Sequence, residues 1–568
     1  MHKIELLAPA GSMANLKAAV SRKADAVYLG MNRFSARDFA TNFNEKYLEE
    51  AVKICKSNNV KVYLAMNTSV KNNEVKTFFN QLSYAYSKGI DAVIIQETSF
   101  LDIIKKNYPD LRAHISTQAG VMNSAHASLL AKADRITLAR ELKKEEIGGI
   151  KKSTKNELEM FCHGALCVSI SGSCLFSSLL GGRSGNRGKC AQPCRKKYNG
   201  TYYLSTKELC LIDKIPDIIS IGVDAMKIEG RMRTPYYVAT MTEVYRKAID
   251  SFYAGDFSVT KEMKNKLNNA FTRGFTKGWF DSSKDIFQRE NPSGESSVRH
   301  KEFYEVNVRD MKLERQRIGA NIPYLPKVKS SGSKLLVRVY SEKDAIAASE
   351  AGADIIYLDI FNDDFVHVKQ SIKSKLFAVT PRIMLDFDKE EVIKAINEKS
   401  PDGILAGNKG MLGLNIPIHL DYNSNVFNDI SLDNLSKIDV TPIISPELSI
   451  NDLKSFSNRN FAVLVHGKIR LMTLRHDLAE GNIKDEKGEL FRVNKIKNGS
   501  EVLNGKELGL LSKSSQLVEV GINNFFIDTE NKVSEVVGLY RDVLDSKKVS
   551  DSKLKKDYVL GWSYRGVK

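Results

Sequence analysis

The sequence predicts an α/β protein in which a TIM-like (β/α)8 barrel with a cysteine-rich insertion is followed by a second, related barrel-like domain. Three observations predict this. Short apolar runs alternate with helix-like stretches in the first half, the second half repeats that pattern, and six of the seven cysteines fall between Cys162 and Cys210. With 568 residues, the chain is also too long for one ordinary hydrophobic core.

The first half contains eight apolar runs at the spacing of barrel strands. Strands that alternate with helices form a parallel sheet, and eight of them are the number that closes a barrel. The runs are ELLAP from Glu5, AVYLG from Ala26, KVYLAM from Lys61, AVIIQ from Ala92, RAHIS from Arg112, DRITL from Asp134, ELEMF from Glu157 and AMKIE from Ala225.

The second half carries internal evidence of a repeat. The segment LSTKELCLIDKIPDIISIGVDAMKIE from Leu204 aligns without gaps on LNGKELGLLSKSSQLVEVGINNFFID from Leu503, and His163 matches His466. The second copy has no cysteine, so we expect the first barrel to carry the chemistry and the second to support it or to bind a partner. The predicted domains are a catalytic barrel at 1–281 with its cysteine loop at 162–210, a linker at 282–333, a second barrel-like domain at 334–545 and a basic tail at 546–568.

The composition and net charge indicate the cellular compartment and the class of partner that we expect. The chain is 42% hydrophobic and 27% charged, with neither a long apolar run nor a signal peptide, so we expect a cytoplasmic protein without a membrane partner. The net charge of +17 favours a polyanionic partner such as RNA. Because the lysines are scattered, an ordinary solvated surface explains the same charge.

Four cysteines, Cys167, Cys174, Cys190 and Cys194, stand at the spacing C-x6-C-x15-C-x3-C. Thiolates bind iron–sulfur clusters and tetrahedral zinc, and four ligands suit either. The spacing is unusual for zinc knuckles, which favours a cluster, while unligated core cysteines are the third reading. Cys162, in a strand-like run, is expected in the core, and Cys210, predicted at the start of a helix, is the reserve ligand.

Polar residues follow the predicted strands, where barrel enzymes place their chemistry. Lys227, Glu229 and Arg231 lie two residues apart, so in an extended strand they point the same way, at a cost unless they are paired or used. Each polar residue could equally be a structural cap. The catalytic candidates are His163 and Glu229, the substrate-binding candidates are Asn67, Gln118, Arg140, Lys227 and Arg231, and Gln96, Glu97 and Ser116 occupy similar positions. A small anion held by Arg140 and Arg231 is one hypothesis.

The sequence gives little support for a hydrolytic enzyme. The sequence contains neither HExxH nor GxSxG, and SGSC at Ser171 lies inside the cysteine loop. His163 and Cys167 could form a thiol dyad, but a thiol that binds metal is not free to act as a nucleophile.

Several segments resemble one known family. They are ELLAPAG from Glu5, ADAVYLG from Ala24, ELEMFCHGALCVSISGSC with GGRSGNRGKCAQPCR, and KIEGRMRTPYYVATMTEVYRKAID from Lys227. These closely resemble the collagenase-like peptidases, peptidase family U32. The match is dense over the first barrel and looser in the second half, through HGKIRLM and the terminal SYRGVK.

The resemblance implies oxygen-independent hydroxylation rather than proteolysis. It implies a [4Fe–4S] cluster on Cys167, Cys174, Cys190 and Cys194, and prephenate as co-substrate, whose carboxylates would suit Arg140 and Arg231. The cysteine segment and the second barrel look most like the branch that hydroxylates a cytidine of 23S ribosomal RNA, although that branch usually carries a further inserted domain for which this chain leaves no room.

Three hypotheses follow. The first is an RNA hydroxylase acting on rRNA or tRNA, with an exposed base reaching the cluster, phosphates held by Lys and Arg, and a redox partner that the sequence does not identify. The second is a peptidase of the U32 type. The third is a non-catalytic iron–sulfur partner subunit.

Overall fold

The structure is a computed structural model whose described chain forms two compact units. It describes residues 3–567 apart from 283, 291–292, 295–303, 310, 312, 314, 329–331, 548, 550–557 and 564. Unit 1 comprises Met1–Val70, Glu74–Gly172 and Ser184–Ile322, and unit 2 comprises Lys71–Asn73, Ser173–Arg183 and Pro323–Lys568. Parts of the predicted linker and of the predicted tail lie outside the described residues. Within the described chain, no helix is both long and apolar enough to cross a membrane.

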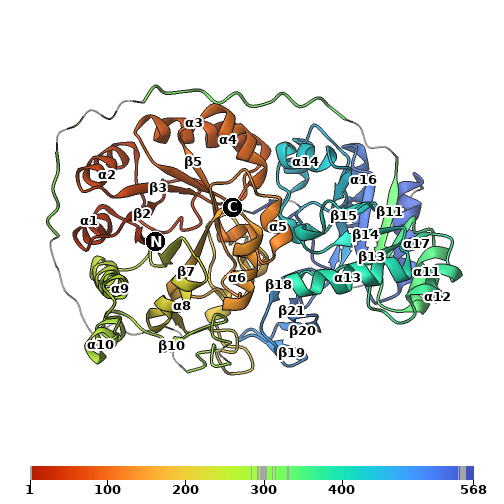
Figure 1. Cartoon of the computed structure of the whole chain (residues 1–568). Coiled ribbons are helices and arrows are strands. Elements are labelled where there is room, and N and C mark those ends of the chain that lie inside the picture. Colours follow the sequence, from red (N-terminus) through yellow and green to blue (C-terminus); the bar gives the residue numbers. More distant parts are fainter. Residues whose placement is uncertain are drawn as a thin grey trace. The chain divides into compact units, whose positions relative to one another are not determined.

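Eight parallel strands close the barrel of unit 1, which confirms the predicted fold class (Figure 1). Each strand pairs with the next along the chain, and β9 pairs with both β7 and β1, so the sheet returns on itself. All the predicted runs form strands. They are β1 (Glu5–Ala10), β2 (Ala26–Leu29), β3 (Lys61–Met66), β4 (Ala92–Ile95), β5 (Arg112–Ile115), β6 (Arg135–Thr137), β7 (Glu157–Ala165) and β9 (Ala225–Ile228).

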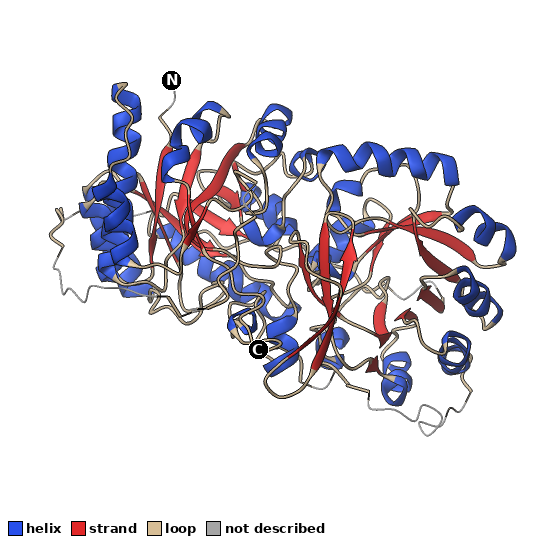
Figure 2. Cartoon of the chain, turned by 90° about the horizontal axis from the view of Figure 1, so that it is seen from below, coloured by secondary structure: helices blue, strands red, loops and turns tan. Residues whose placement is uncertain are grey.

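Helices surround these strands (Figure 2). Local sequence explains their ends: Ser12 and Thr234 accept bonds from backbone N–H groups of the first turns of α1 and α9, and α9 ends at Gly255, whose φ of 85° suits glycine. The helices are α1 (Met13–Ser21), α2 (Glu45–Ser57), α3 (Val75–Ser87), α4 (Leu101–Asn107), α5 (Ser124–Ser128), α6 (Lys144–Ser153), α8 (Ile215–Ser220), α9 (Pro235–Ala254) and α10 (Lys261–Ala270).

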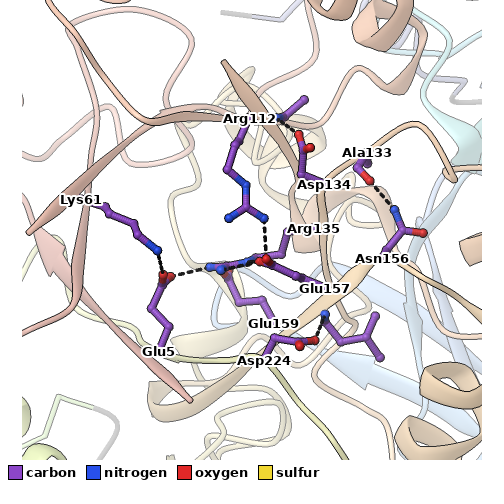
Figure 3. A network of polar contacts seen from close by, with 12 residues as sticks. Glu5, Lys61, Arg112, Ala133, Asp134, Arg135, Asn156, Glu157, Glu159 and Asp224 are labelled. Atoms are coloured by element: carbon purple, nitrogen blue, oxygen red, sulfur yellow. Dashed lines mark hydrogen bonds and ion pairs between the residues drawn. The ribbon is translucent and has the colours of Figure 1, made fainter. Parts of the chain in front are cut away.

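A network of ion pairs lies inside the barrel of unit 1, near the N-terminal ends of its strands (Figure 3). Arg135 contacts Glu5 at 2.6 Å and Glu157 at 2.7 Å. Glu159 receives Arg135 at 3.4 Å and Lys227 at 2.9 Å. Burial alone would raise the pKa of Glu5, but Arg135 holds it below its ordinary value. Alternating charges therefore compensate one another inside the barrel.

A short antiparallel strand, β8 (Glu208–Cys210), pairs with the end of β7 and returns the chain after the cysteine-rich insertion. Cys210 pairs with His163 in this ladder, and the next helical turn begins only at Ile212. The prediction that Cys210 starts a helix is therefore wrong, because pairing with β7 keeps this residue extended. Cys162 is fully buried in β7, which confirms its predicted place in the core. A last strand, β10 (Phe275–Thr276), pairs with β8.

Unit 2 contains a second barrel of parallel strands. The sheet runs from β16 round to β17, and a parallel bridge between Ile443 and Ala462 joins these two ends. The strands are β11 (Lys334–Arg338), β12 (Ile355–Asp359), β13 (Lys375–Val379), β14 (Gly403–Ala406), β15 (Ile418–Leu420), β16 (Val440–Pro442), β17 (Val463–Gly467) and β23 (Asn524–Asp528). The helices are α11 (Glu342–Glu350), α12 (Phe365–Ser371), α13 (Asp386–Lys399), α14 (Asp429–Ser436), α15 (Ile450–Lys454), α16 (Leu511–Glu519) and α17 (Val533–Leu544).

The internal repeat is confirmed at the level of single backbone pairs. In unit 2, β22 (Leu508–Gly509) runs antiparallel to β17 and pairs His466 with Gly509, as β8 pairs Cys210 with His163. Unit 2 also has an insertion at this point, an antiparallel sheet of β18 (Arg470–Leu474), β19 (Gly481–Lys484), β20 (Leu490–Ile496) and β21 (Gly499–Leu503). Both copies therefore carry an insertion between these two strands, although the insertion of unit 2 has no cysteine.

Part of the cysteine-rich insertion folds with unit 2. The segment Ser173–Arg183, which contains Cys174 and α7 (Phe176–Gly181), belongs to that unit. Cys174 forms an antiparallel bridge with Met472 of β18. Trp562, near the C-terminus, donates from Nε1 to the carbonyl oxygen of Ser178 at 3.1 Å. The described end of the predicted tail is therefore ordered against this segment.

Candidate active site

The C-terminal ends of the strands of unit 1 form the barrel mouth. Ala26 and Tyr28 of β2 and Ala92 and Ile94 of β4 share one buried interior cluster. Because strand side chains alternate, the next interior position on β4 is Gln96. The mouth therefore begins where this apolar cluster ends.

Charged residues occupy the mouth beside β9 and β2. The Nζ of Lys227 lies 4.5 Å from the ring centre of Tyr28, and the Cζ of Arg231 lies 5.9 Å from it. Glu229 accepts bonds from Arg37 at 3.1 and 3.0 Å, which, with the nearby Arg233, keeps the pKa of this carboxyl below its ordinary value although burial alone would raise it. The strand ends at Ile228, so Arg231 is reached through a turn rather than along an extended strand, yet the three predicted charges still converge around Tyr28.

Arg231 differs from the other buried charges of the mouth. Its residue is 3% exposed, and Nη1 has no hydrogen-bond partner among the described residues. Burial lowers the pKa of its guanidinium to about 10. A Cβ on Gly30 would stand 2.3 Å from that Nη1, so only glycine leaves room for the guanidinium here. A buried donor without a partner costs about 1–3 kcal/mol, which a bound anion would offset.

Arg140 lies beside the first residues of the insertion. Its guanidinium donates to the carbonyl oxygen of Ala165 at 2.9 Å and to the hydroxyl of Ser171 at 2.8 Å. It also lies over the ring of Phe161 at 5.0 Å, and it is among the charges that lower the pKa of Glu229. Arg140 is thus positioned by structural contacts, within electrostatic range of the mouth.

On the opposite side of the mouth, at β3 to β5, Asn67, Gln96 and Ser116 are uncharged, and the nearby carboxylate of Glu97 accepts from the backbone N–H of Val70. Asn67 donates to the hydroxyl of Ser116 at 3.3 Å and accepts from the backbone N–H of Ala36 at 3.1 Å. Gln96, at the end of the intervening strand β4, is 7% exposed, and neither polar atom of its amide has a hydrogen-bond partner among the described residues. This side therefore offers an amide rather than a charge.

Three other candidates have structural surroundings. Glu97 accepts from the backbone N–H of Val70 at 3.0 Å. The backbone of Gln118, in a short turn, packs against the insertion, because its carbonyl oxygen would stand 2.1 Å from a Cβ on Gly172. His163 is 1% exposed, and its Nδ1 lies 3.3 Å from the hydroxyl of Tyr245 on α9. Burial lowers the pKa of His163 to about 3, so its ring is neutral, as suits a core residue.

Three thiols of unit 1 form the remaining part of the site. Burial raises the pKa values of the Cys167 and Cys194 thiols above their ordinary value. Arg140 donates to Ala165 and Ser171, which lie on either side of Cys167 in the sequence. The backbone N–H of Asp38, next to Arg37, donates to the carbonyl oxygen of Gly188, two residues before Cys190. The thiols therefore adjoin the charged side of the mouth.

Thiolates are donors that an iron–sulfur cluster or a zinc ion can use. Among the described residues, no three His, Cys, Asp or Glu side chains are arranged to hold one metal ion. Each cysteine of a [4Fe–4S] cluster binds a different iron, so its thiols need not converge on one point. The donor set, soft thiolates beside arginines, is compatible with such a cluster.

Sequence reasoning missed three members of the site. Arg37 lies in the loop after β2, Tyr28 lies within that strand, and Glu159 lies at the third position of β7. The position of Arg37 after a strand end was a signal, but a long loop gives no register. The partners of Tyr28 and Glu159 come from β9, far away in the sequence.

Fold and site together define a (β/α)8-barrel protein with a thiol-rich insertion beside a cationic mouth. Comparison with known proteins is consistent with this class: the profile of peptidase family U32 matches residues 11–289. The chain is 39% identical over 302 residues to an uncharacterized protease of Methanocaldococcus jannaschii, covering 49% of this chain and 74% of that protein. The chain belongs to peptidase family U32.

Two further relatives have names that state a role. Identity is 32% over 302 residues with tRNA hydroxylation protein P1 of Bacillus subtilis, covering 50% of this chain and 72% of that protein. Identity is 31% over 299 residues with the 23S rRNA 5-hydroxycytidine C2501 synthase of Escherichia coli, covering 50% of this chain and 45% of that protein. Both alignments cover about half of this chain.

Proposed function

We propose that the protein is an RNA hydroxylase that modifies a pyrimidine base of rRNA or tRNA without molecular oxygen. The observation that carries this proposal is that the segments holding Cys167 and Cys190 contact the cationic mouth, through Arg140 at Ala165 and Ser171 and through Asp38 at Gly188. The relatives named for tRNA hydroxylation and for 23S rRNA hydroxycytidine synthesis support RNA as the substrate.

In this proposal Cys167, Cys174, Cys190 and Cys194 hold a [4Fe–4S] cluster, which would supply electron transfer when bound. Arg231 and Arg140 would bind the carboxylates of prephenate, because Arg231 has a buried donor without a partner. Lys227 is fixed by Glu159 and would orient that co-substrate from below. Arg37, held by Glu229, would close the side facing the loop after β2.

The geometry around His163 does not support the thiol peptidase hypothesis. His163, the proposed base of the dyad, contacts Tyr245 and lies 5.4 Å, ring centre to ring centre, from Phe275. Aromatic rings enclose His163, and the equivalent His466 of unit 2 also contacts a tyrosine, Tyr540 of α17. His163 is therefore better explained as a core residue that recurs in the second copy.

The test is metal analysis together with RNA mass spectrometry. We expect protein purified without oxygen to contain about four irons and four sulfides per chain. RNA from cells that lack the protein should lose one hydroxylated pyrimidine, and the wild-type gene should restore it. Stoichiometric zinc, or an unchanged set of RNA modifications, would contradict the proposal.

A further inference from the structure

The mouth of unit 1 is divided into a charged side and a neutral side. Arg37, Lys227, Glu229 and Arg231 lie on the charged side, with β9 and the loop after β2. Asn67, Gln96 and Ser116 lie at the ends of β3, β4 and β5. In the order of the barrel, β4 lies opposite β9. A ligand that spans the mouth would therefore meet cations on one side and amides on the other.

Gln96 is the unusual member of the neutral side. Asn67 and Ser116 bond to each other across the end of β4, which leaves Gln96 as the interior residue between them. Its amide carries two donor hydrogens and one acceptor oxygen, yet neither atom has a partner among the described residues, although the residue is 7% exposed. Buried amides are nearly always hydrogen-bonded, so this one is available to a ligand.

We infer that Gln96 reads the hydrogen-bonding edge of the pyrimidine base. This inference rests on the proposed function and deepens it. A glutamine amide can pair with two neighbouring atoms of a base edge, one as donor and one as acceptor. On cytosine, the amide oxygen accepts from the exocyclic amine and the amide nitrogen donates to N3. On uracil, the oxygen accepts from N3–H and the nitrogen donates to O4, so one residue serves both pyrimidines.

The neutral character of this side favours a base over a second anion. The side chains of Asn67, Gln96 and Ser116 are uncharged, and Asn67 forms hydrogen bonds with the uncharged hydroxyl of Ser116 and the backbone N–H of Ala36. The pairing requires a base that is single-stranded or turned out of its helix, because its edge must be free.

The test uses the full-length protein with Gln96→Met, which keeps the size of the side chain and removes its hydrogen bonds. Binding is measured with single-stranded RNA oligonucleotides that carry cytidine, uridine or an abasic site at one central position. We expect the wild type to prefer either pyrimidine over the abasic oligonucleotide by about tenfold, and Gln96→Met to lose that preference. Gln516→Leu, on exposed α16 of unit 2, is the control and should keep it.

Thermal unfolding separates recognition from a structural role. Because the amide of Gln96 has no partner, Gln96→Met should match or exceed the wild-type melting temperature. A lowered melting temperature with the loss of preference would overturn the inference in favour of a structural role, and an unchanged preference would overturn it outright. Loss of preference in a protein that leaves cellular RNA unhydroxylated would support base reading while contradicting the proposed reaction.

Discussion

The two barrels have the same framework of strands and helices, but they differ in whether their buried arginines form ion pairs. In unit 1, the hydroxyl of Tyr245 bonds to the carbonyl oxygen of Cys162 at 2.8 Å, and in unit 2 the hydroxyl of Tyr540 bonds to the carbonyl oxygen of Val465 at 2.9 Å. Both tyrosines lie on the helix after the last barrel strand, and both also accept a backbone N–H from the residue directly after the antiparallel return strand. The repeated framework is therefore structural.

The difference lies at the charged residues near the strand ends. Arg470 of unit 2 contacts Glu501 at 2.9 Å and also Asp528, while Arg382 contacts Asp421 at 2.8 Å. Arg231 of unit 1 has no ion pair among the described residues. A barrel that neutralises its own cations is stable without a ligand, whereas one that leaves a buried cation unpaired is prepared for an anion.

The largest expected effect concerns the thiols that only unit 1 contributes near its mouth. Replacing Cys190 and Cys194 by serine should remove the iron and lower hydroxylation by more than about 100-fold, since cluster ligands are lost. Iron content, visible absorption and RNA mass spectrometry are the measurements. Cys55→Ala, in α2 and outside the insertion, is the control. Full iron content in the double variant would show that these two cysteines do not bind the iron.

The second prediction contrasts the two arginines directly. Arg470→Met should lower the free energy of unfolding by about 3–5 kcal/mol, because it leaves two buried carboxylates without their cation. Arg231→Met should leave stability nearly unchanged and lower kcat/KM for hydroxylation by about 10- to 100-fold, since a charge-assisted contact is lost. Urea unfolding and kinetics measure both. Equal destabilisation by the two changes would show that Arg231 is a structural residue.

The third prediction concerns acid. The folded pKa of Glu5 is lowered, so its ionised form is favoured by folding. Its contribution to stability is present above the ordinary value of 4.5 and is lost as the pH falls through the lower folded pKa. Wild-type protein should lose more stability between pH 6 and pH 3 than Glu5→Gln does, when urea unfolding is followed at each pH. Equal losses of unfolding free energy in the wild type and the variant would mean that this ion pair does not contribute to stability.

The smallest effect concerns the segment of the insertion that belongs to unit 2. Trp562→Phe removes one buried hydrogen bond to Ser178 and should cost about 1 kcal/mol. Amide hydrogen exchange should increase within Ser173–Arg183, which contains Cys174. Trp279→Phe, in unit 1, is the matched control. Unchanged exchange in the Trp562 variant would show that the other contacts of the segment, with Met472 and Glu447, hold it in place.

Much of the fold could be predicted from the sequence because it depends on local periodicity. Apolar runs such as ADAVYLG and the gapless repeat gave the strands and the two barrels. Cys210 was misplaced because its extended conformation comes from pairing with His163, which no local pattern records. The insertion of unit 2 was not predicted, because it contains no cysteine that would mark it in the sequence.

The sequence by itself determined the barrel class, the cysteine spacing and the set of polar residues at strand ends, since each follows from residue type and period. Only the tertiary structure decided which of those polar residues are already paired. Glu97 has a structural partner and His163 has one at Nδ1, whereas Lys227 and Glu229 have ionic partners. Arg231 and the amide of Gln96 keep buried groups without a partner among the described residues. The physical reason is that pairing depends on distances between strands that are remote in sequence, such as β2 and β9, and those distances exist only once the barrel has closed.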